Sequence, residues 1–189
     1  MTENNINHLG LKLSWFPASE ADAVEPLLNN WLTDTGSLTE RLQANCRQFS
    51  VKLLAQGLSA ITENESQLLY GQFGNVEQQT EVREVLLMAD DHPWVFARSL
   101  MPQPFLQEAM THLKDLGDKP LGKIIFNDPR FRRQKFELTK IDSTQLPTQW
   151  NLPAGILLWG RRSLFTFSHY HMMVSELFLP ASPAYSRLV

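Results

Sequence analysis

The chain has 189 residues, of which 43% are hydrophobic, and a formal net charge of -3 at pH 7. A chain of this length and composition can bury one continuous core, so we expect a single domain over residues 1–189. The charge lacks the excess of Lys and Arg that sequence-independent binding to nucleic acid requires. Nucleic acid is therefore not an expected partner.

Cys46 is the single cysteine, so no internal disulfide can form. The first ten residues are polar and do not join a basic start to an apolar stretch of signal-peptide length. No window approaches the roughly 20 apolar residues needed to span a bilayer. We expect a cytoplasmic protein with no stable membrane insertion.

Charge is unevenly distributed along the chain. Residues 1–91 contain 5 basic and 13 acidic side chains, whereas residues 119–165 contain 9 basic and 3 acidic ones. The positive segment is either a solvated face or a means of attracting a small anion, and the composition leaves both interpretations open.

In the first half of the chain, apolar residues at helical spacing predict a helix within residues 20–32. A second short helix is expected after Ser37, with Glu40 three residues later completing a capping box. Residues 49–54 suit a strand. The polar stretch 63–79 is interpreted as a loop.

The second half contains clearer signals. Residues 80–102 read as two strands around an Asp-Asp-His turn, and residues 105–117 as a helix that ends at Gly117. Another strand is expected over 131–141, and two more follow around a tight turn near residues 169–171. Strands joined by tight turns run antiparallel, so the pattern predicts an α+β fold.

The familiar cofactor and hydrolase motifs are absent: there is no GxGxxG, phosphate-binding loop, GxSxG, HExxH or CxxC. We therefore expect no cofactor. His169 and His171 have strand spacing, but no third ligand is adjacent in the sequence, so an exposed turn is favoured over a metal site.

Arg83 and Glu176 interrupt apolar strands. Alternation places Arg83 on the same side as Val85 and Leu87, and it places Glu176 between Val174 and Phe178. One interpretation is a buried ion pair, with each other or with other charges. The other is a site in which the Arg offers two parallel donors to a carboxylate while the Glu faces a hydroxyl or a proton at the ligand's other end.

Five segments together resemble the chorismate pyruvate-lyase family, from about Asp34 to Tyr185. They are DTGSLTERL, VREVLLMADDHPWVFARSLMP, LGDKPLGKIIF, LWGRRSLFTFS and SELFLPASPAY. The resemblance implies a chorismate lyase-like domain with a six-stranded antiparallel sheet, helices, and helical lids over an internal ligand cavity. It also implies an enzyme that eliminates pyruvate from chorismate to give 4-hydroxybenzoate for ubiquinone biosynthesis. We expect this enzyme to be a monomer.

The resemblance assigns roles to four positions. Arg83 would grip the ring carboxylate, and Glu176 would meet the 4-hydroxyl group. Leu121 would contact the ligand through its backbone, and Leu38 would line the cavity wall. For the two leucines, packing in the core is an equally good interpretation.

Other features leave alternatives open. Arg161 and Arg162 are candidates for the second carboxylate of chorismate, although an exposed or helix-capping role fits them as well. Two rival functions are a non-catalytic ligand-binding module, as in the effector domains of bacterial transcription regulators of this fold, and a lyase acting on a modified chorismate. About 33 residues precede the first matching segment, too few for the DNA-binding domain that normally precedes such an effector domain.

Overall fold

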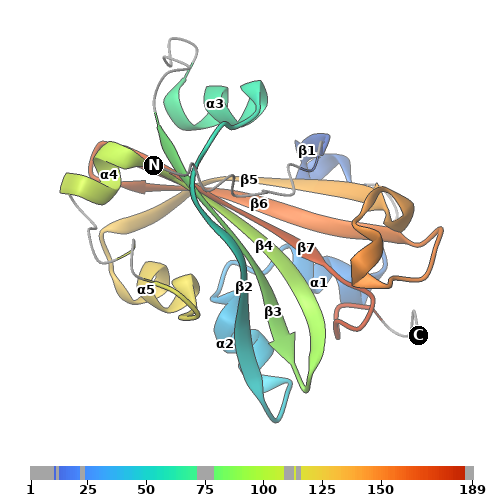
Figure 1. The fold of residues 1–189 in the computed structure, drawn as a ribbon. Helices are drawn as coiled ribbons and strands as arrows, with labels where there is room; N and C mark the ends of the chain where they lie inside the picture. Colours follow the sequence, from blue (N-terminus) through green and yellow to red (C-terminus); the bar gives the residue numbers. More distant parts are fainter. Residues whose placement is uncertain are drawn as a thin grey trace.

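A computed structural model of the chain describes residues 11, 13–21, 24–71, 79–108, 113 and 116–185. Its described strands form one antiparallel sheet in the order β1-β5-β6-β7-β4-β3-β2 (Figure 1). The strands are β1 (Trp15–Pro17), β2 (Phe49–Ser59), β3 (Thr80–Ala89), β4 (His92–Pro102), β5 (Phe131–Asp142), β6 (Leu157–Phe167) and β7 (Tyr170–Phe178).

Helices cover both faces of this sheet. Figure 1 shows α1, α2 and α5 on one face and α3 on the other. The α-helices are α1 (Pro26–Leu32), α2 (Leu38–Ala44), α3 (Glu63–Tyr70), α4 (Gln103–Glu108) and α5 (Leu121–Asn127). Short 3-10 turns occur at Ala18–Glu20, Ser143–Gln145 and Thr148–Trp150. The α+β class predicted from the sequence is confirmed.

The expectation of six strands was wrong by one, because β1 adds a seventh at the edge. β1 pairs with β5 through Trp15 and Thr139, and the Thr139 hydroxyl donates a hydrogen bond of 2.8 Å to the Ser14 carbonyl. A strand of three residues is too short to show alternation, so the sequence carried no signal for it.

Two predictions for the first half need correction. The helix within residues 20–32 begins only at Pro26, where a proline suits the first helical position because that residue needs no N–H partner. Within the expected loop 63–79, α3 forms; residues 72–78 lie outside the described residues. Thr62 and Glu65 make a complete capping box there, which is a recognisable start signal. At Ser37, the side chain accepts a bond from the Glu40 backbone N–H.

The remaining elements agree with the sequence more closely. The strand expected over 49–54 continues to Ser59. The β3–β4 hairpin turns at Asp90 and Asp91, whose φ angles of 47° and 66° suit a tight turn of the type that matches strand twist. Of the helix expected over 105–117, α4 covers the beginning; residues 109–112, 114 and 115 lie outside the described residues. Gly117 follows with a positive φ of 54°.

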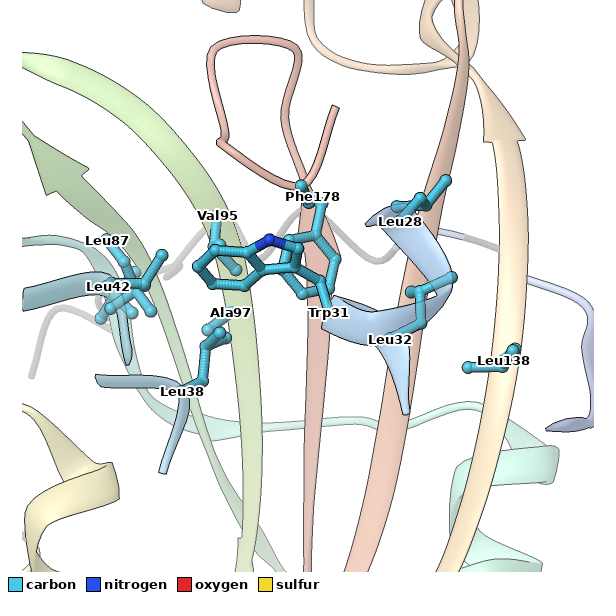
Figure 2. Packing of buried hydrophobic residues seen from close by; sticks show 12 residues of the cluster. Leu28, Trp31, Leu32, Leu38, Leu42, Leu87, Val95, Ala97, Leu138 and Phe178 are labelled. Atoms are coloured by element: carbon cyan, nitrogen blue, oxygen red, sulfur yellow. The ribbon is translucent and has the colours of Figure 1, made fainter. Parts of the chain in front are cut away.

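The main core joins α1 and α2 to the sheet. Figure 2 shows the Trp31 ring beside Phe178 of β7, and the two ring centroids are 6.3 Å apart. Leu32 and Leu42 are fully buried in the same cluster. Removing these large side chains from water provides the driving force that fixes α1 and α2 on this face.

None of the helices in the described part of the chain is long and apolar enough to cross a membrane.

Candidate functional site

A cavity lies between the sheet and the helices α2 and α5. Leu38 of α2, Arg83 of β3, Leu121 of α5 and Glu176 of β7 all border it. Its volume is only about 40 Å³. That space holds a few waters, so the walls must move apart before a ring-sized ligand can enter.

The strand register explains why these side chains converge. Val85 of β3, Ala97 of β4 and Glu176 of β7 form one row of paired residues across the sheet. Arg83 and Ser99 lie in the neighbouring row, two residues along each strand, and therefore point to the same face. The alternation seen in the sequence thus brings Arg83 and Glu176 to one face.

Arg83 is 2% exposed and is held by backbone carbonyls. One terminal nitrogen donates to the carbonyls of Gly117 and Lys119 at 2.8 and 3.0 Å. Its Nε atom is buried without a hydrogen-bond partner. Burial lowers the pKa of Arg83 to about 10, which still leaves the guanidinium positively charged at neutral pH. The side chain is fixed by the loop before α5 yet retains donor capacity.

Glu176 forms an ion pair with Arg161, the residue opposite it on β6. Arg161 Nε lies 2.6 Å from Glu176 Oε2, and the two side chains are 1% and 16% exposed. Of the alternatives left open by the sequence, an ion pair is therefore present for Glu176, with Arg161 as its partner and not Arg83. The pair fixes one carboxylate oxygen of Glu176 and leaves the side chain at the cavity wall.

Arg161 also caps a helix. Its terminal nitrogen NH1 donates to the carbonyls of Trp31, Leu32 and Asp34 at 3.0, 3.4 and 2.8 Å. The Trp31 and Leu32 carbonyls belong to the last turn of α1, where they lack partners within the helix, and Asp34 follows that helix. The helix-capping role considered for this residue is the one observed, and its Nε and NH1 donors are occupied by Glu176 and by backbone carbonyls.

Arg162, the other candidate for the second carboxylate, points to the opposite face of the sheet from this cavity. It pairs with Glu137 at 2.7 Å and with the Asn64 side chain at 2.6 Å. A larger cavity of about 360 Å³ lies on that face under α3, where Arg98 is paired with Glu65 and Glu84 at 3.0 and 2.6 Å. Arg98, the arginine that lines this larger cavity, already has two carboxylate partners, which disfavours an added anion.

Arg133 of β5 borders the first cavity and was not singled out by the sequence analysis. Its Nε is buried without a hydrogen-bond partner, and its one hydrogen bond in the described structure is a long one, 3.4 Å, from NH1 to the Asp34 carbonyl. Burial lowers its pKa first, and the charge of Arg161 lowers it further. The run FRRQKF was the only signal, and it does not reveal which arginine faces inward.

The roof of the cavity depends on a close approach of two helices. A Cβ atom on Gly122 of α5 would lie 2.6 Å from the Thr39 Oγ1 atom of α2, well inside contact distance. An alanine at this position would require the Thr39 side chain to shift or α2 and α5 to move apart. Leu38 and Leu121, which begin these helices, are therefore held over the sheet as a pair.

The histidine pair lies at the β6–β7 turn, away from this cavity. His171 makes a 3.2 Å hydrogen bond with the Thr166 hydroxyl, and the His169 ring lies 4.0 Å from the Tyr170 ring. Within the described residues, no group of three His, Cys, Asp or Glu side chains could hold a metal ion.

Residues 10–189 match the sequence model of the chorismate lyase family. The chain belongs to the chorismate lyase family. It is 45% identical over 160 residues to a probable chorismate pyruvate-lyase of Pseudoalteromonas atlantica, covering 84% of this chain and 82% of the relative. A second probable chorismate pyruvate-lyase, from a Shewanella species (strain W3-18-1), is 39% identical over 178 residues, covering 92% of this chain and 91% of the relative.

Solved structures of regulator domains share the fold of this chorismate lyase family member at low identity. The effector domain of PhnF from Mycobacterium smegmatis has a TM-score of 0.54 and 17% identity, with 77% of this chain and 90% of that domain covered. A GntR-family transcriptional regulator from Enterococcus faecalis has a TM-score of 0.53 and 11% identity, covering 76% and 98%. These similarities concern the fold alone.

Proposed function

We propose that the chain is a chorismate pyruvate-lyase that converts chorismate to 4-hydroxybenzoate and pyruvate, in the pathway to ubiquinone. The family and the relatives support this reaction over most of the chain. The observation that carries it in the structure is the buried guanidinium of Arg83, with an unpaired Nε, on the same sheet face as Glu176. A carboxylate is the ligand that such a fork binds best.

In this reaction the C3–O bond of chorismate breaks and the hydrogen on C4 leaves as a proton. The electron pair of the C4–H bond enters the ring, which becomes aromatic, while the enolpyruvate leaving group gains a proton and becomes pyruvate. Aromatisation supplies the driving force. The protein must orient the enolpyruvyl arm and stabilise developing charge, and positioning alone is worth about 7 to 11 kcal/mol.

The four residues take distinct roles in this proposal. Arg83 binds the ring carboxylate, and Glu176 meets the C4 hydroxyl end, where bonding changes. Leu121 offers its backbone to the ligand, and Leu38 forms apolar wall. The Arg161 pair supports the role of Glu176, because it holds the carboxylate in one orientation before substrate arrives.

The helices α2 and α5 act as lids over the cavity. The narrow cavity supports this, since a ring cannot enter until those helices separate from the sheet. We propose that the whole of 1–189 is one chorismate lyase-like domain, acting as a cytoplasmic monomer without a cofactor.

The test is incubation of the purified protein with chorismate, followed by detection of both products. Equal amounts of pyruvate and 4-hydroxybenzoate are expected, in the presence or absence of a strong chelator. Binding of 4-hydroxybenzoate without pyruvate release would instead indicate a ligand-binding module, and turnover restored only by added metal would refute the cofactor-free reaction.

A further inference from the structure

Two buried side-chain nitrogen or oxygen atoms in the described structure lack a hydrogen-bond partner, and both are guanidinium Nε atoms. They belong to Arg83 and Arg133, and both residues border the same cavity. Buried donors are nearly always satisfied, because leaving them unpaired forfeits the hydrogen bonds that water would make. Two such donors around one cavity indicate a ligand with two separate acceptor groups.

A β-bulge is what turns Arg133 inward. In β5, Phe136 lies on the cavity side, so strict alternation would place Arg133, three residues earlier, on the other face. The register of β5 on β6 shifts between Arg133 and Lys135, and Arg133 pairs with Phe165, another cavity residue. Bulges commonly re-aim a side chain next to a functional site.

Aromatic rings surround the guanidinium of Arg133. Its guanidinium carbon lies 5.2 to 5.8 Å from the ring centroids of Phe126, Phe136 and Phe165. Within the described residues it makes no direct ion pair, although the charges of Glu176 and Asp34 attract it from farther away; the carboxylate of Glu176 is paired directly with Arg161. A partly buried guanidinium whose Nε has no hydrogen-bond partner attracts an anion because water screens it less than at the surface.

We propose that Arg133 binds the carboxylate of the enolpyruvyl arm of chorismate, while Arg83 binds the ring carboxylate. The inference rests on the proposed function, since it names the second contact of the same substrate. The sheet order β5-β6-β7-β4-β3 places Arg133 and Arg83 on opposite sides of Glu176. In chorismate the ring carboxylate on C1 and the arm on C3 are separate anionic groups, so the two carboxylates need cations at different places in the cavity.

This assignment separates substrate from product. The ring carboxylate remains on 4-hydroxybenzoate, but the arm carboxylate leaves with pyruvate. Arg133 therefore contributes to binding of chorismate and of the transition state, and contributes nothing to binding of 4-hydroxybenzoate. A merely structural arginine would affect both ligands alike.

The experiment compares Arg133→Met with Arg132→Met, which removes an exposed arginine from the adjacent position of β5. For each variant, kcat/KM with chorismate and the dissociation constant of 4-hydroxybenzoate are measured. Arg133→Met should lower kcat/KM at least about 30-fold, the effect of truncating one partner of a buried charge pair. Its dissociation constant for 4-hydroxybenzoate should stay within about two-fold of the wild-type value. For Arg132→Met, both kcat/KM and this dissociation constant should stay within about two-fold of the wild-type values.

A folded Arg133→Met protein with unchanged kcat/KM would overturn the proposal, and so would an equal loss of chorismate and 4-hydroxybenzoate binding. If that variant does not fold, Arg133→Lys serves the same test, because it keeps the charge but loses Nε. It should show a smaller loss that is again confined to chorismate. Wild-type protein that releases no pyruvate would refute the proposed function itself, before any variant is compared.

Discussion

Replacing Glu176 by Gln tests the chemistry of the site with the smallest change of shape. The amide keeps the size of the side chain and an oxygen that can accept from Arg161, whose Nε now lies 2.6 Å from the carboxylate. It removes the negative charge at the hydroxyl end of the cavity. If Glu176 acts where bonding changes, the rate should suffer more than binding.

The cost in stability can be bounded from the geometry. Breaking a fully buried pair by removing one partner costs about 3 to 5 kcal/mol. Glu176 is 16% exposed, and the Gln oxygen can still accept a hydrogen bond, so we expect a loss of about 1 to 2 kcal/mol in the free energy of unfolding. The variant should therefore fold.

The effects on ligands follow from the same reasoning. A hydrogen bond from the product's hydroxyl to a charged acceptor is stronger than one to a neutral amide by about 1 kcal/mol, which weakens 4-hydroxybenzoate binding by a factor of about five. Positioned proton transfer contributes about 10² to 10⁴ in rate. We therefore expect single-turnover elimination to slow by about 100-fold or more.

The assay is a single-turnover measurement of pyruvate formation with enzyme in excess, which isolates elimination from product release. Glu137→Gln is the matched control, because Glu137 pairs with Arg162 at 2.7 Å, is 12% exposed, and lies on the opposite face of the sheet. The control should lose similar stability and keep its rate. A folded Glu176→Gln enzyme that eliminates pyruvate at nearly the wild-type rate would refute the reasoning and leave Glu176 as a structural partner of Arg161.

Three further outcomes are expected. Arg83→Met should weaken the binding of 4-hydroxybenzoate by about 2 to 5 kcal/mol in a titration, because the ring carboxylate loses its buried partner. An affinity near that of the wild-type protein would place the carboxylate elsewhere. Product release should limit turnover, and the measurement should show a burst of one pyruvate per enzyme; a linear time course would contradict this. Gly122→Ala should speed product release because the added Cβ atom forces α2 away from α5, and adding Thr39→Ala should restore the wild-type rate. Tyr185→Phe should lower the free energy of unfolding by about 1 to 3 kcal/mol in a denaturant titration, because the backbone N–H of Trp159 loses its acceptor. Burial raises the pKa of Tyr185, so the extra stability of the wild-type protein over this variant should decline as the pH rises above about 10. A stability difference that does not change with pH would contradict this reasoning.

The sequence by itself determined the strands that form the site. Alternation in residues 80–89 and 170–178 fixed the faces of Arg83 and Glu176, because side chains in a strand point to opposite sides with a period of two. The Asp-Asp turn, with its tolerance of positive φ, fixed the hairpin between β3 and β4. These signals are local, so they can be recognised without knowing the rest of the fold.

Local signals were also available where the prediction failed. The capping box of Thr62 and Glu65 indicates the start of α3, although the low apolar content of this segment suggested a loop. The proline at the start of α1 marked a later beginning than the apolar spacing implied. In both places a specific start signal described the helix better than average composition did.

Only the tertiary structure decided which charges are partners. Arg161 and Arg162 are neighbours in the sequence, yet one reaches Glu176 and α1 while the other reaches Glu137 on the opposite face. The bulge that directs Arg133 into the cavity depends on the pairing of β5 with β6, which places Arg133 opposite Phe165, 32 positions later in the chain. Ion pairs and register of this kind are set by packing between distant segments, so no pattern within a single segment can specify them.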